Sequence, residues 1–290
     1  MKKILFTLAL LHIVTLSFCT TGTITKNYNF KTVKSIDASS IYEIEIVQGN
    51  QEGVTIICDE AYEEYIDIRY HMGELTLAMK PNIRMVKKDN AGIKVYLQMP
   101  TIEEIDLSGA SKLKATGSFE TRELDIELSG ATSLTGLEVS GNELSIDCSG
   151  ASKLNMSGNF TKIDTEASGA SSVVLNCNSK EFDIEVSGAS NVSVNGSHKY
   201  TEASCSGAAN LKLEGNSDYI KSATSGASSL KAQNYATQNG YAELSGASKA
   251  KIRCSGDLKI LVGKACNLTY YGNPNIIDLD KNSNIRKGDD

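Results

Sequence analysis

The sequence predicts an all-β protein built as a parallel β-helix, a solenoid of about eight to nine coils with a β-hairpin-rich N-terminal cap. Three observations lead to this fold class: a phrase that recurs at a nearly constant interval, an alternation of polar and apolar residues, and a composition rich in small, turn-forming residues. The 290 residues include 24 glycines, three prolines and no tryptophan. A chain of this length can bury a full core, so disorder is not expected.

The recurring phrase is Ser-Gly-Ala followed by a small or polar residue and, two positions later, an aliphatic one. Eight copies begin 19 to 21 residues apart, at Ser108, Ser129, Ser149, Ser168, Ser187, Ser206, Ser225 and Ser245. A degenerate ninth copy runs from Val262 to Leu268. Self-similarity at a fixed period of about 20 residues is typical of a solenoid, whose units bury their apolar faces against one another.

Each unit is expected to hold two short strands. The segments 123–128 and 182–186 alternate polar and apolar residues, which indicates strands with one face inward, and helical spacing is absent. The Ser-Gly-Ala phrase would form the corner between the strands, because glycine adopts backbone angles that other residues avoid. A motif present on every coil is more naturally a folding constraint than eight copies of an active site.

Residues 1–19 have the layout of a secretory signal peptide, with Lys2 and Lys3 before an apolar stretch that is too short to span a membrane. We therefore expect export to the periplasm or to the outer membrane and cell surface. The segment Leu16-Ser17-Phe18-Cys19 is similar to a lipobox, which would make Cys19 a lipidated first residue, although Phe18 replaces a small residue. Ordinary cleavage after Cys19 fits equally well, and both readings stay open.

The remainder reads as one continuous domain without a linker. Residues 24–106 are β-rich, with alternating stretches at 42–47, 54–58, 66–70, 75–79 and 93–99. We expect hairpins there that cover the first coil, because an open solenoid end exposes unpaired backbone groups. Residues 107–274 are the β-helix repeats, and residues 275–290 are expected to form a loose polar tail.

Three motifs together resemble a known family. They are the repeated Ser-Gly-Ala-Ser-x-Leu units, the run Ile93-Lys-Val-Tyr-Leu-Gln-Met-Pro100 and the segment Leu268-Thr-Tyr-Tyr-Gly-Asn-Pro274. Over residues 32–274 the chain looks like the head GIN domain family of auto-transporter adhesins, found mainly in Bacteroides-like bacteria. The resemblance implies an exported all-β protein on or near the cell envelope, and it implies no site residues.

Alignment of the repeats places equivalent residues in columns along the solenoid. Acids occupy the positions two and four residues before Ser-Gly in most of the first five copies: Asp106, Glu127, Asp147, Glu166 and Glu185, and Glu104, Asp125, Asp164 and Asp183. Stacked like charges are unfavourable, so we hypothesise that these carboxylates bind Ca²⁺ or another hard cation. The alternative is a solvated face kept charged for solubility. The calcium-binding Gly-Gly-x-Gly-x-Asp repeat is absent, and no other cofactor is expected.

The charge balance argues against two classes of partner. The whole chain has a net charge of −6, and removal of residues 1–19 makes it −8 because two lysines are lost. Nucleic-acid readers and binders of anionic membranes need the opposite sign. Membrane association is therefore expected only through lipid on Cys19. The sequence does not indicate an oligomeric state.

An enzyme is not predicted. Parallel β-helices include polysaccharide lyases and hydrolases, but here the acids repeat regularly instead of interrupting the repeat. Beyond the signal only His71 and His198 remain, and His198 is expected to lie in an exposed loop. Six cysteines, Cys58, Cys148, Cys177, Cys205, Cys254 and Cys266, are expected to be buried free thiols, with Cys254 and Cys266 the pair hardest to exclude as a disulfide.

The sequence thus predicts an exported binding module, like an adhesin, without catalytic activity. Its partner would be a glycan or a surface protein. A structural scaffold of the cell envelope is the first alternative, and a polysaccharide-active β-helix enzyme is the second.

Overall fold

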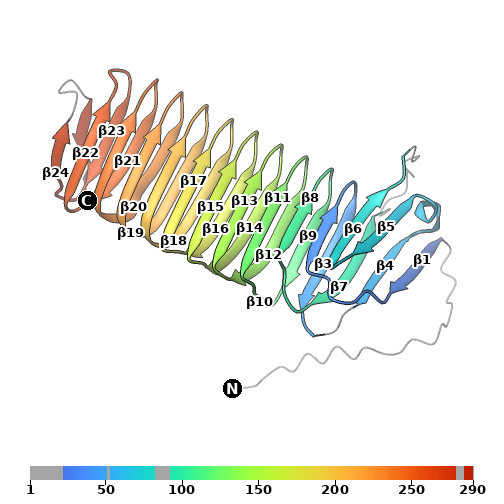
Figure 1. The fold of residues 1–290 in the computed structure, drawn as a ribbon. Helices are drawn as coiled ribbons and strands as arrows, with labels where there is room; N and C mark the ends of the chain where they lie inside the picture. Colours follow the sequence, from blue (N-terminus) through green and yellow to red (C-terminus); the bar gives the residue numbers. More distant parts are fainter. Residues whose placement is uncertain (1–21, 51–52, 82–91, 279–283, 290) are drawn as a thin grey trace.

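The structure, a computed structural model, describes residues 22–50, 53–81, 92–278 and 284–289. It is a β-solenoid in which successive coils stack side by side from one end of the molecule to the other (Figure 1). Its one described helical element is the short 3₁₀ turn Glu60–Tyr62. No helix among these residues is long and apolar enough to cross a membrane. The predicted fold class is confirmed, and the predicted signal peptide with Cys19 lies outside the described residues.

Every coil contributes one strand to each of two sheets. The first sheet begins with the antiparallel pair β5 and β6 and continues with parallel strands. In spatial order its strands are β5 (Ile66–His71), β6 (Glu74–Met79), β2 (Ser35–Ala38), β8 (Glu104–Leu107), β11 (Glu123–Leu128), β13 (Glu143–Cys148), β15 (Lys162–Ala167), β17 (Glu181–Val186), the C-terminal halves of β18 (Asn191–Cys205), β19 (Asn210–Thr224) and β20 (Ser229–Leu244), β22 (Asp257–Val262) and β24 (Asn275–Asp278).

The second sheet begins with three antiparallel strands and is parallel thereafter. Its order is β1 (Thr23–Tyr28), β4 (Gly53–Asp59), β7 (Ile93–Met99), β3 (Tyr42–Gln48), β9 (Lys112–Thr116), β12 (Ser133–Ser140), β14 (Lys153–Asn159), β16 (Ser172–Asn178), the N-terminal halves of β18, β19 and β20, β21 (Lys249–Cys254), β23 (Asn267–Tyr271) and β25 (Ile285–Lys287). The short β10 (Ser118–Glu120) pairs with the end of β12.

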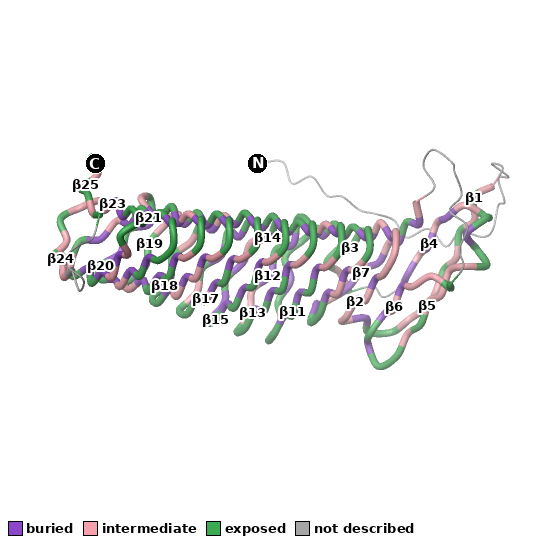
Figure 2. Tube along the Cα trace, turned by 90° about the horizontal axis from the view of Figure 1, so that it is seen from above, coloured by how far each residue is buried: buried purple, intermediate pink, exposed green. Residues whose placement is uncertain are grey.

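Inward residues of the two sheets form the core, and they alternate with exposed residues along each coil (Figure 2). Ile105, Ile126 and Ile146 stack in one such inward column of the first sheet. All six described cysteines are buried and free, so Cys254 and Cys266 do not pair and the predicted role as small core residues is confirmed. Burial raises the pKa of the Cys148 and Cys177 thiols to about 12, which keeps them protonated.

Successive coils approach closely at the Ser-Gly-Ala corner. All eight corner glycines have φ between 65° and 73°, in the region that favours glycine. At a typical corner, the Ala189 N–H donates to the Gly169 carbonyl of the preceding coil at 2.7 Å. A Cβ on Gly188 would lie 2.6 Å from that same carbonyl oxygen. The corner therefore needs glycine both for its angles and for the room that it leaves.

The N-terminal cap contains the expected antiparallel strands, but it also adds coils that the repeat phrase does not mark. β2 and β3 form a coil that lies between the β6–β7 coil and the β8–β9 coil. Its corner holds Ser40 at φ 96°, where later coils have glycine, and the Ser40 carbonyl accepts from the Ala110 N–H at 2.6 Å. Stacked rings of Tyr28, Phe30 and Tyr70 join β1 and β5 at the end of the solenoid.

The C-terminal segment corrects one expectation. Residues 275–290 were expected to be a loose tail, yet β24 pairs with β22 and β25 pairs with β23 in parallel register. The segment thus continues the solenoid by a further coil. The sequence pattern misses this coil because it has no Ser-Gly-Ala corner and its strands are only four and three residues long.

The corner geometry predicts a large difference between two glycine-to-alanine substitutions. Gly188→Ala should lower the free energy of unfolding by about 2 kcal/mol or more, because strained backbone angles combine with the collision against Gly169. The matched control is Gly53→Ala, whose Cβ would meet nothing closer than the Tyr28 carbonyl at 3.9 Å. Urea denaturation of both variants checks this, and equal midpoints would contradict the steric explanation.

Candidate functional site

The carboxylates singled out in the sequence form two columns on the outward face of the first sheet, here called the acidic face. Glu127 pairs in register with Asp106 on one side and Asp147 on the other, and Glu166 and Glu185 follow. The second column runs through Glu104, Asp125, Ser145, Asp164 and Asp183. The structure thus brings all nine predicted residues onto one surface. It also adds Asp37 beside Asp106, which the repeat alignment could not show.

Stacking of like charges has an electrostatic consequence. Partial burial, with the neighbouring Asp37, Glu127 and Glu104 carboxylates, raises the pKa of Asp106 above its ordinary value. Asp183 has its pKa raised in the same way, by partial burial and then by Asp164, Glu202 and Glu185. The columns are thus held in register by the backbone against the mutual repulsion of their side chains.

Cation binding by these columns stays a prediction. Within the described ranges, no group of three or more His, Cys, Asp or Glu side chains is arranged to hold a metal ion. The columns are a one-dimensional array with one carboxylate per coil at each position, whereas calcium needs six to eight oxygen ligands around one point.

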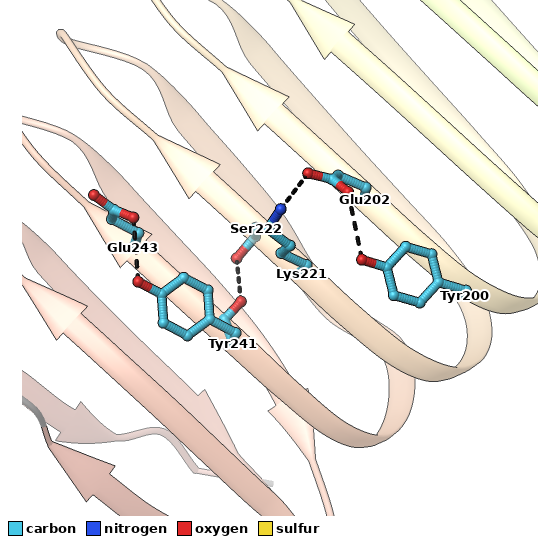
Figure 3. A network of polar contacts seen from close by, with 6 residues as sticks. All are labelled: Tyr200, Glu202, Lys221, Ser222, Tyr241 and Glu243. Carbon is cyan, nitrogen blue, oxygen red and sulfur yellow. Dashed lines mark hydrogen bonds and ion pairs between the residues drawn. The ribbon is translucent and has the colours of Figure 1, made fainter.

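The acidic columns change character at β18. A group of six side chains, here called the tyrosine patch, follows on the same face: Tyr200, Glu202, Tyr219, Lys221, Tyr241 and Glu243. The Lys221 ammonium donates to Glu202 Oε1 at 2.6 Å, and the Tyr200 hydroxyl donates to Glu202 Oε2 at 3.4 Å (Figure 3). The Tyr241 hydroxyl donates to Glu243 Oε2 at 3.2 Å. The spacing from Ser-Gly aligns Glu202, Lys221 and Tyr241 in one column, whereas the stacking of Tyr200 and Tyr219 beside it is seen only in the structure.

His198 is not in an exposed loop, and that expectation is wrong. The side chain is 4% exposed, within β18, and its ring stacks on Phe182 at 4.7 Å between centroids. Its Nδ1 shares a hydrogen bond with Ser179 Oγ at 2.7 Å. Burial lowers the pKa of His198 to about 4, so the ring is neutral near pH 7. His198 is in register with Ser217 of the next coil, which is buried, and this alignment could have revealed that the His198 side chain points inward.

The acidic columns predict that removing one charge stabilises the protein. Asp183→Asn should raise the free energy of unfolding at pH 7 by about 0.2–1 kcal/mol, because the ionised carboxylate faces three acidic neighbours. Since the raised pKa favours the protonated acid in the folded state, the gain should shrink as the pH falls and Asp183 itself becomes neutral. Denaturant titrations at pH 7 and pH 4 measure this. Asp218→Asn, at an exposed position outside both columns, is the control, and an equal gain there would contradict the prediction.

The buried histidine predicts a loss of stability in acid. The ordinary pKa of 6.5 falls to about 4 on folding, so the contribution is complete above pH 6.5 and declines as the pH falls toward 4. The full effect is about 3 kcal/mol. Comparison of wild type with His198→Phe across this range isolates it, and His71→Phe at an exposed strand end is the control. Parallel pH profiles for wild type and His198→Phe would refute the assignment.

Solved structures similar to this chain include three from Parabacteroides species. A "putative adhesin" from Parabacteroides merdae ATCC 43184 is 18% identical, with 93% of this chain and 98% of that chain covered and a TM-score of 0.51. A "putative adhesin" and a "putative lipid binding protein" from Parabacteroides distasonis ATCC 8503 are 17% and 15% identical. The match to the first of these two covers 92% of this chain and 97% of that chain, with a TM-score of 0.45. The match to the second covers 93% of this chain and 98% of that chain, with a TM-score of 0.42. At such identities the likeness concerns the fold alone, and only the first score supports it.

A comparison with curated proteins finds no match. The comparison with protein families is more informative. The family model described as "Putative auto-transporter adhesin, head GIN domain" matches residues 30–201 and 173–274. The two matches overlap and together span the cap, the acidic face and the tyrosine patch, which is well over half of the sequence. The chain therefore belongs to the auto-transporter adhesin head GIN domain family.

Proposed function

We propose that this protein is an exported, non-catalytic binding module that presents its solenoid surface to a partner at the cell surface, as an adhesin does. The observation that supports this most directly is the in-register array on the acidic face. On this face, the side chain at a given position of one coil lies beside the side chain at the same position of the next coil. Such an array offers many weak contacts of one chemistry along a line, which suits adhesion to a repetitive surface.

Rigidity supports the same proposal. The strands that carry the acidic face are paired on both sides through most of the solenoid, and their inward residues are fully buried. The backbone of such a scaffold loses little further freedom when a partner binds. The fold thus prepares a binding surface without the conformational closure that enzymes often need.

Export is part of the proposal. Residues 1–19 would direct the chain out of the cytoplasm, and Cys19 would either carry a lipid anchor or end the signal peptide. Membership in an adhesin family supports a location at or beyond the cell surface.

Protease treatment of intact cells tests this location. In the native bacterium, added protease should degrade the wild-type protein without opening the outer membrane, because the solenoid lies outside. If Cys19 carries the anchor, Cys19→Ala should release the protein into the medium. Full protection until the outer membrane is opened would refute surface display and favour an envelope scaffold.

Adhesion itself needs a second measurement. Deletion of the gene should lower attachment of the bacterium to mucus-coated or cell-coated surfaces, and wild-type protein should restore it. A periplasmic protein of known location serves as the control for envelope integrity. Unchanged attachment, with surface display confirmed, would contradict the adhesin function.

A further inference from the structure

The tyrosine patch lies where the acidic columns end, since β22 beyond it holds Lys259 and Leu261 at the same outward positions. In β17 the three outward positions hold Glu181, Asp183 and Glu185, and the same positions in β18 hold Tyr200, Glu202 and Ser204. In β19 they hold Tyr219, Lys221 and Ala223. Two aromatic rings thus replace acids in one column, while small residues replace acids in another. Folding does not require this departure, because the inward residues of these coils remain buried, so the aromatic rings on the outward face mark a place where a specific contact is expected.

Hydrogen bonds hold the patch in place before any partner binds. The Tyr200 and Tyr219 rings stack with 5.6 Å between centroids and 2° between planes, and Tyr200 is 38% exposed. Glu202 fixes both the Tyr200 hydroxyl and the Lys221 ammonium (Figure 3). The patch therefore presents aromatic carbon beside fixed hydroxyl, carboxylate and ammonium groups, so that binding requires little further ordering.

This combination suits a sugar. The C–H groups of a pyranose ring pack on aromatic carbon, and its hydroxyls both donate to carboxylates and accept from tyrosine hydroxyls or ammonium groups. Successive coils are separated by about 4.8 Å, the spacing of hydrogen-bonded strands. An extended 1,4-linked glycan advances by a similar length per ring, so a chain laid along the solenoid axis would meet equivalent positions of successive coils.

The charge of the neighbouring acidic columns and the backbone pairing of the patch strands argue against two classes of partner, anionic glycans and peptides added as an extra strand. The acidic columns continue from Glu181, Asp183 and Glu185 directly beside the patch, so an anionic glycan would be repelled. A peptide added as an extra strand needs free backbone groups. Here the patch strands of β18 and β19 are paired with a neighbouring strand on each side.

The geometry points to the tyrosine patch as a binding site for a neutral, extended polysaccharide that lies parallel to the solenoid axis across β18, β19 and β20. This inference rests on the proposed binding function and names its ligand class and site. The stacked Tyr200 and Tyr219 rings provide the apolar contact, and Glu202, Lys221 and Glu243 bind the sugar hydroxyls. The partner is a glycan and not a protein.

Calorimetric titration of the purified protein tests the site with defined probes. These are β-1,4-linked oligomers of glucose and of N-acetylglucosamine, from two to six rings, and a hexamer of galacturonic acid as the anionic probe. At least one neutral series should bind, with an affinity that rises from two rings to three and then levels off because the patch spans three coils. The anionic hexamer should bind at least about tenfold more weakly or not at all.

Substitutions locate the binding. The double variant Tyr200→Ala with Tyr219→Ala should weaken the neutral oligomer at least about tenfold, and Tyr200→Phe should weaken it less, because it keeps the ring and loses the hydroxyl. Tyr96→Ala is the matched control, since Tyr96 is a half-buried tyrosine of β7 in the second sheet. Melting curves of each variant confirm that these surface changes leave the fold intact.

The outcomes separate this inference from the proposed function. If the double tyrosine variant still binds the neutral oligomer with unchanged affinity, the tyrosine patch is not the binding site, although the proposed binding function stands. Adhesion of the bacterium without affinity for any neutral oligomer would overturn the ligand class, and a protein partner would then carry the adhesion. Equal affinity for the anionic hexamer would overturn the charge argument. Both the binding function and the glycan site are supported if gene deletion abolishes adhesion and if the double tyrosine variant, but not the Tyr96→Ala control, loses affinity for the neutral oligomer.

Discussion

Close backbone approach between successive coils is the constraint on which the rest of the structure depends. At each corner a carbonyl of one coil accepts from the next at 2.6 to 2.8 Å, and a Cβ there would collide with the backbone below. The corner glycines therefore fix the rise and the register together. Once the register is fixed, every inward residue stacks on the equivalent residue of the next coil. The apolar core then consists of such columns, and each coil packs only against its neighbours.

The same register determines what the surface can do. Because outward residues also stack on their equivalents, a carboxylate repeated in sequence becomes a carboxylate column. Partial burial, followed by the charge of the neighbouring carboxylates, raises the pKa of Asp106 and Asp183. The scaffold tolerates this repulsion because backbone pairing and the buried apolar side chains hold the strands together. A local change of sequence, such as the tyrosines of β18 and β19, then alters the surface of a few coils without disturbing the core.

Much of this architecture could be predicted from the repeat. The eight corners, the two acidic columns and the buried cysteines all follow from aligning the copies, because a parallel stack converts sequence period into spatial register. The coil of β2 and β3 could not be recognised, since Ser40 takes a left-handed angle where the pattern has glycine. His198 was misread because Gly196 and Ser197 suggest a turn, whereas β18 continues through them. The repeat aligns Glu202, Lys221 and Tyr241, but the stacking of the Tyr200 and Tyr219 rings depends on side-chain conformations that sequence spacing does not specify.

The position of β2 in the first sheet has a consequence for how the chain is assembled. β2 comes early in the chain, yet its two neighbours, β6 and β8, are made later, and β3 likewise waits for β7 and β9. A chain is made from its N-terminus, so β2 has no neighbour until β6 has been made as far as Met79, and β3 has none until β7 has been made as far as Met99. Every later coil finds its neighbour already in place. Nucleation is therefore slow and non-local at one end, and growth is local and directional toward the other.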